Sequence, residues 1–182
     1  MSKKKQLSSR TIELIKGLEV DDAKAILKTL SKIENEGNEA MIIPLIELGI
    51  KRDETEIRDF VQKILFNLKI SSAHSIILNE LDKMDANPFR RELIAAVWNA
   101  EINGMDHMDT FVRIAIEGSF YEAIECLTVI EESNGELIEE KILESLLLLK
   151  AYMDDPANEK DEKRPIIQNI FEKVSLLNQG IV

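Results

Sequence analysis

A helical pattern of apolar residues occurs twice in this chain, 32 residues apart, and it restricts the folds open to the sequence. DETEIR at 53–58 and DANPFR at 85–90 each place an Asp five residues before an Arg, with a large apolar residue just ahead of that Arg. Counted from this apolar residue as position zero, both copies have apolar residues at positions 0, 4, 7, 8 and 11: Ile57, Val61, Ile64, Leu65 and Leu68, then Phe89, Leu93, Ala96, Val97 and Ala100. This spacing marks one face of a helix, and a period of this length built from two helices predicts an α-solenoid.

Helical periodicity extends through the rest of the chain. Hydrophobic residues make up 45% of the 182 residues, aromatic residues 5%, and there are seven glycines, a composition that favours helices. Apolar segments alternate with short polar joints, which predicts about ten helices in five consecutive hairpins. We expect Asp21 or Asp22 to cap the second helix, Gly37 to end it, and Pro44 to bend or delay the third. The predicted fold class is all-α, with one domain over residues 7–180 after a disordered basic segment at 1–6.

The last two hairpins depart from the pattern. In the fourth, the turn is short and Tyr121 falls where the Arg is expected. In the fifth, a long acidic turn, DDPANEKDEK, precedes a copy that deviates at its first position: Lys163, Ile167, Ile170, Phe171 and Val174. We interpret these two departures as the more informative features for binding.

The two clear copies resemble HEAT repeats, a family of armadillo-like helical repeats. IIPLIELGIKRDETEIRDFVQKILFNLK at 42–69 has an apolar first helix with a proline, a polar turn with Asp, an apolar-Arg pair and paired aliphatic residues. IILNELDKMDANPFRRELIAAVWNA at 76–100 is similar, and its Asn87-Pro88 fits the family's turn. The resemblance covers roughly residues 38–101 and implies a right-handed stack of hairpins whose second helices line a concave face.

The resemblance also suggests a role for the repeated Asp and Arg residues. It implies that Arg58 and Arg90 reach turn acids of their own or the adjacent repeat, so that Asp53, Arg58, Asp85 and Arg90 form a structural ladder. A guanidinium group can bind a carboxylate through two hydrogen bonds and can also satisfy free carbonyls in a turn. Arg91 competes with Arg90 for this contact. Alternatively, the two arginines bind a phosphate or carboxylate group of a ligand on the concave face.

The leading functional prediction is a non-catalytic scaffold that binds a protein or peptide on its concave face, because solenoids offer an extended binding surface. The expected face consists of second-helix positions that point away from the apolar stripe: Gln62, Lys63, Asn67, Ala95, Asn99, Glu125, Glu132, Asn169 and Lys173. A second possibility is a structural module that self-associates through an uncovered end of the stack. We expect a monomer or a weak homodimer.

The charge is concentrated toward one end of the sequence. Residues 117–162 include 14 acidic and three basic residues, so this segment accounts for the chain's net charge of −11. Such a segment repels phosphate backbones and suits a basic partner. Alternatively, its charges only form a solvated surface that increases the solubility of the protein. An enzymatic alternative is a HEAT-like DNA glycosylase that uses Trp98, Arg90, Arg91 and Asp85. The sequence pI near 4.8 and the absence of a basic stripe count against it.

Motifs for other chemistry are sparse. His74 and His107 lie 33 residues apart without a set of nearby ligands, and Cys126 is the single cysteine, in an apolar context. The sequence contains neither a nucleophile elbow nor a glycine-rich phosphate loop. Because the apolar runs are short, we predict a cytoplasmic protein without a membrane span. Because these motifs are missing, we expect neither a metal nor a cofactor.

Overall fold

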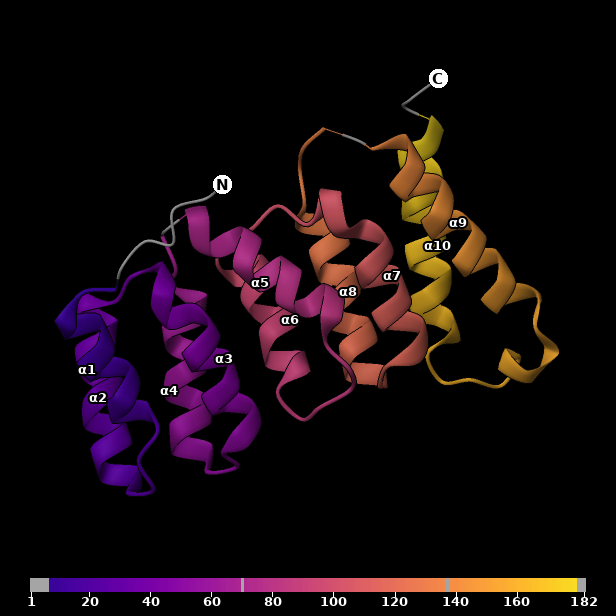
Figure 1. The fold of residues 1–182 in the computed structure, drawn as a ribbon. Helices are drawn as coiled ribbons and strands as arrows, with labels where there is room; N and C mark the ends of the chain where they lie inside the picture. The colour runs from indigo at the N-terminus through magenta and orange to yellow at the C-terminus, as the bar shows by residue number, and fades with distance from the viewer. Residues whose placement is uncertain (1–6, 70, 137, 180–182) are drawn as a thin grey trace. The chain divides into compact units, whose positions relative to one another are not determined.

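The computed structural model describes residues 7–69, 71–136 and 138–179 (Figure 1). Within these residues the chain forms ten α-helices and three short 3-10 helices, and no strand, which confirms the all-α class and the expected number of helices. No helix in this part of the chain is long and apolar enough to cross a bilayer. The N-terminal segment 1–6, predicted to be disordered, lies outside the described residues.

The contacts of the chain separate into two compact units, Met1–Ile77 and Leu78–Val182. The first contains α1 (Ser9–Leu18), α2 (Ala23–Glu36), η1 (Glu39–Met41), α3 (Ile42–Lys51) and α4 (Thr55–Phe66). The division falls within α5 (Ser71–Lys83). The second unit continues with α6 (Arg90–Asn99), η2 (Met105–His107), α7 (Met108–Glu117), α8 (Phe120–Glu132), α9 (Glu139–Asp154), η3 (Pro156–Asn158) and α10 (Arg164–Gln179). The expectation of one domain over 7–180 stays a prediction.

In the first unit, two helical hairpins pack with like helices side by side. The first helix α1 contacts α3, the second helix α2 contacts α4, and each first helix contacts its own second helix. The Asp22 side chain accepts a hydrogen bond from the backbone N–H of Lys24 and caps α2, and Gly37 ends that helix, as predicted. Pro44 lies in the first turn of α3, where its missing N–H interrupts no helical hydrogen bond, and η1 precedes the helix.

The second unit repeats this order of packing. The second helices α6, α8 and α10 contact one another in sequence order, and the first helices α7 and α9 lie against each other. In both copies of the apolar pattern, positions 0, 4, 7 and 8 are buried and position 11 is half-buried. The sequence pattern therefore identified the packed face of α4 and α6.

The fourth hairpin has a different register from the one that the sequence suggested. Ala123, Cys126 and Ile130 are buried, whereas Tyr121 is 60% exposed. These burials match the apolar pattern only if position zero is Ser119, which caps α8, rather than Phe120. The residue after position zero is then Phe120, so Tyr121 does not occupy the place of the repeated arginine.

Candidate binding surfaces

Arg58 stabilises the end of the first helix of its own hairpin. Its Nε donates hydrogen bonds to the carbonyls of Arg52, at 2.7 Å, and Gly49, at 3.2 Å. These carbonyls lie at the end of α3, where a helix has no backbone donors left for them. Asp53 is exposed and is not a partner of Arg58, so the contact joins Arg58 to backbone rather than to the predicted acid.

Arg90 forms a buried ion pair with Glu122, a partner that the sequence did not suggest. The Nε of Arg90 lies 2.6 Å from Oε1 of Glu122, and the two side chains are only 4% and 10% exposed. Glu122 also accepts hydrogen bonds from the backbone N–H and hydroxyl of Ser119, in a capping box that begins α8. Burial alone would raise the pKa of Glu122, but the hydrogen bonds from Arg90 and Ser119 outweigh it and hold that pKa below its usual value.

The neighbouring arginine has a surface role. The Nε of Arg91 lies 3.4 Å from Glu125 Oε1, and its guanidinium group lies 5.1 Å from the ring centre of Tyr121. Arg90, not Arg91, therefore makes the buried contact between hairpins. Asp85 is exposed and is not the partner of either arginine.

Two cations of the fifth hairpin make contacts that the sequence did not predict, although Lys163 was noted as the deviating first position of that copy. Arg164 follows Lys163 at the same offset as Arg58 follows Ile57, and its Nη2 donates to the carbonyl of Met153 at 3.1 Å, near the end of α9. Lys163 is buried and donates to carbonyls at the end of α7, including that of Gly118 at 2.8 Å. The common offset of the arginines was the signal that could have found Arg164.

The residues predicted to form a concave face divide between the two units. Gln62, Lys63 and Asn67 lie on or just after α4, and the remaining six lie on α6, α8 and α10. Eight of the nine are exposed or half-buried: Gln62, Lys63, Asn67, Asn99, Glu125, Glu132, Asn169 and Lys173. Ala95 is only 6% exposed, because Leu93 to Val97 are all buried and α6 has no wide surface face. Ala95 is therefore not available to a partner.

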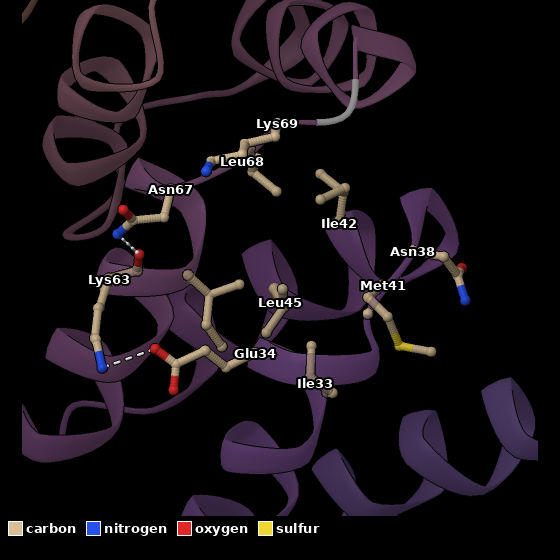
Figure 2. A pocket seen from close by; sticks show the side chains of 12 residues that line it. Ile33, Glu34, Asn38, Met41, Ile42, Leu45, Lys63, Asn67, Leu68 and Lys69 are labelled. Carbon is tan, nitrogen blue, oxygen red and sulfur yellow. Dashed lines mark hydrogen bonds and ion pairs between the residues drawn. The ribbon is translucent and has the colours of Figure 1, made fainter.

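A pocket of about 220 Å³ in the first unit includes two of the predicted residues, Lys63 and Asn67 (Figure 2). It lies where the ends of α2 and α4 meet the start of α3. Buried apolar side chains form its wall, and exposed polar residues form its rim. The wall consists of Ile33, Met41, Ile42, Leu45 and Ile64 with half-buried Leu68; the rim consists of Glu34, Gly37, Asn38, Lys63, Asn67 and Lys69.

Polar contacts across the rim fix the position of Lys63. Its Nζ lies 2.7 Å from Glu34 Oε1, and the Asn67 amide donates to the Lys63 carbonyl at 2.8 Å. Figure 2 marks both contacts with dashed lines. The Lys63 ammonium group also lies 5.5 Å from the ring centre of Phe60. The ion pair connects α2 with α4, so charged residues of two second helices border the pocket.

A more polar hollow of about 340 Å³ lies in the second unit, beside the ends of α6 and α8. Its lining residues are Trp98, Glu101, Ile102, Asn103, Val129, Glu132, Ser133 and Asn134. The indole N–H of Trp98 donates a hydrogen bond to the Glu125 carboxylate at 3.0 Å, so Trp98 on α6 is joined to α8 beside the hollow. Glu101 has φ 55°, a left-handed conformation at the end of α6 where glycine is more common.

The side chains considered for a glycosylase are brought together only in part. Arg91 and Trp98 both bond the Glu125 carboxylate, whereas Arg90 is buried in its pair with Glu122 and Asp85 is exposed. Cys126 is buried, and burial raises the pKa of its thiol far above the usual value. Among the described residues, no three His, Cys, Asp or Glu side chains are grouped so that they could hold a metal ion.

Comparison of the chain with protein-family models, with curated proteins and with solved structures finds no match. The resemblance to HEAT repeats therefore rests on the residues of this chain alone.

Proposed function

We propose that the chain is a non-catalytic protein- or peptide-binding module, built as a right-handed α-solenoid of about five HEAT-like hairpins. The packing order within each unit supports this architecture, because first helices contact first helices and second helices contact second helices. Stacking of this kind exposes one side of the second helices along the whole array, which is the surface that solenoids use for binding. In the first unit, Lys63 and Asn67 are second-helix residues of this kind, and in the second unit Glu125 and Glu132 are.

The pocket of the first unit carries the proposal. Small-molecule and cofactor sites usually enclose about 300–1,000 Å³. A pocket of about 220 Å³ instead suits one large apolar side chain. Its buried aliphatic wall would bind such a side chain, and its exposed rim offers amides and charges to the flanking peptide. An apolar anchor within a polar rim is the usual organisation of a protein-binding site.

The rim also limits what can bind. Glu34 and Lys63 neutralise each other at 2.7 Å, and Lys69 adds a positive charge at the edge. Asn38 and Asn67 have amide groups that can pair with a peptide backbone. The pocket thus favours an extended or turned peptide with one aliphatic or aromatic anchor.

A selection from a random peptide library displayed on phage, with the full chain as bait, tests this function. Enriched peptides should share one large apolar residue, and a labelled synthetic copy should bind in solution by fluorescence anisotropy. Leu68→Ala should weaken that binding roughly tenfold, because it removes part of the apolar wall. Ile43→Ala is the matched control, since Ile43 is 44% exposed on α3 and does not line the pocket.

Two results would count against the proposal. One is the absence of any enriched peptide. The other is a selected peptide whose affinity is unchanged by Leu68→Ala, which would place its binding elsewhere on the chain.

A further inference from the structure

Helix α9 is apolar on two opposite sides, and only one of them is packed. Ile142, Ser145, Leu149 and Tyr152 are buried. The helix packs against α7 and α10 (Figure 1). On the other side, Leu143 is 46% exposed and Leu147 is 71% exposed. These two leucines are four residues apart, so they lie one above the other along the helix, with Ala151 one turn further.

This exposed stripe, Leu143 and Leu147, is bordered by acidic side chains. A shallow depression on α9 is lined by the two leucines together with Glu139, Glu140 and Glu144. Lys141 is held by Asp109 on α7, at 2.6 Å between Nζ and Oδ2, and it also lies 3.9 Å from Oε2 of Glu144. An exposed lysine, Lys150, lies three residues after Leu147. Among the described residues Glu139 and Glu140 take part in no ion pair.

A single exposed leucine on a protein surface needs no explanation. Here two leucines and three carboxylates line the same shallow depression on one helix. The surrounding segment strengthens the charge, because residues 117–162 include 14 acidic and three basic residues. An apolar stripe with acidic edges is complementary to a surface with an apolar stripe and basic edges.

We propose that this face of α9 binds an amphipathic basic helix of a partner protein. Apolar side chains at i and i+4 of the partner would pack beside Leu143 and Leu147, since rows of this spacing fit between the rows of a facing helix. Lys or Arg residues beside that apolar row would reach Glu139, Glu140 and Glu144. The charged pairs would accelerate association and select the partner, while the leucines would supply most of the affinity.

A second copy of this chain is a poorer occupant of the same face. A two-fold contact joins identical patches, so α9 against α9 would bring carboxylates of both copies together around the leucines. Like charges placed opposite each other in an interface oppose association. The charge of the face therefore favours a different protein over self-association.

The inference does not depend on the pocket of the first unit, because α9 belongs to the second unit and shares no residue with that pocket.

The probe for the α9 face is a fluorescein-labelled amphipathic peptide of leucines and lysines, about four helical turns long. Its control has the same leucines with every lysine replaced by glutamate. Binding of each peptide to the full chain is measured by fluorescence anisotropy.

Variants of α9 assign the binding to this face. Leu147→Gln should weaken binding of the basic peptide roughly tenfold, whereas Leu176→Gln, at a residue 65% exposed on α10, should leave it unchanged. Replacing Glu139, Glu140 and Glu144 by Gln should weaken binding and reduce its salt dependence. The matched charge control changes three exposed acids that do not line the depression, Glu136, Glu159 and Glu162.

The expected result is selective binding of the basic peptide that responds to the α9 variants and not to their controls. Equal binding of the acidic peptide, or equal losses in Leu147→Gln and Leu176→Gln, would overturn the inference. Light scattering adds a further test: a concentration-dependent dimer that Leu147→Gln abolishes would show that a second copy occupies the face, and would also overturn it.

Discussion

Replacing Arg90 by Met tests whether the contact between the third and fourth hairpins depends on a buried ion pair. Met retains the apolar stem of Arg90 without its guanidinium group, so it leaves the Glu122 carboxylate without its cation in a site where the two side chains are 4% and 10% exposed. Removing one partner of a buried pair costs about 3–5 kcal/mol, because the remaining charge is not compensated. Two hydrogen bonds from Ser119 still reach Glu122, so we expect the lower end, about 3 kcal/mol.

The assay is urea unfolding followed by the fluorescence of Trp98, the single tryptophan of the chain. Trp98 lies on α6, the helix that Arg90 begins, so its signal reports on the unit that the substitution affects. Arg91→Met is the matched control: Arg91 is 51% exposed and lies 3.4 Å from Glu125. A surface pair of this kind contributes about 0–1 kcal/mol.

A double-mutant cycle separates the free energy of the Arg90–Glu122 ion pair from that of the Ser119–Glu122 capping box. Glu122→Gln removes the buried charge but keeps an oxygen that can accept from Ser119. The double variant Arg90→Met/Glu122→Gln should therefore be more stable than the sum of the two single losses predicts, by about 2 kcal/mol. Strict additivity, or a loss in Arg90→Met no larger than that in Arg91→Met, would refute the reasoning.

The same pair predicts a dependence on pH. Because the pKa of Glu122 is lower in the folded protein than its ordinary value of 4.5, its contribution to stability is fully present above that pH. The contribution is lost as the pH falls through the lower, folded-state value. As the pH is lowered from neutral to well below 4.5, the free energy of unfolding should therefore fall more in the wild type than in Glu122→Gln.

Three further substitutions or reactions test other features. Lys163→Met removes the buried ammonium group from the carbonyls at the end of α7, including that of Gly118, and should cost about 1–3 kcal/mol in the same urea assay; an unchanged midpoint would contradict the capping role. Glu101→Gly should stabilise the chain by about 0.5–1 kcal/mol, because glycine adopts the left-handed conformation of residue 101 without strain; a loss would show that the Glu101 side chain is needed. Cys126 should react with a thiol reagent only after urea unfolding, because it is buried and its thiol pKa is raised; rapid reaction of the folded chain would contradict its burial.

The sequence predicted the helices well because their signals are local. The caps at Asp22 and Gly37, and the buried face of α4 and α6, follow from residues that lie within a few turns of each other. The register predicted for α8 was wrong by one residue. The pattern starts at Ser119, but the large apolar residue next to it, Phe120, was taken as its first position. Periodicity alone did not decide which of two adjacent positions faces the neighbouring helix.

The candidate surfaces were predicted only in part. Lys63 and Asn67 were assigned to a binding face and do border the pocket. Ala95 was assigned to the same face but is buried, because α6 is surrounded on most sides. The exposed side of α9 was not predicted: four consecutive leucines, 146–149, point in four directions around a helix, and the sequence does not say which direction remains uncovered.

The sequence by itself determined the class of the fold, the number and approximate limits of the helices, and the apolar face of the clearest repeats. These depend on hydrogen bonds and side-chain spacings within a single helix or turn. The tertiary structure decided that Arg90 pairs with Glu122 rather than Asp85, that Lys63 and Glu34 border a pocket, and that Leu147 remains exposed. Each of these outcomes depends on packing between segments about 30 residues apart, where a small change in register brings a different side chain within hydrogen-bonding distance.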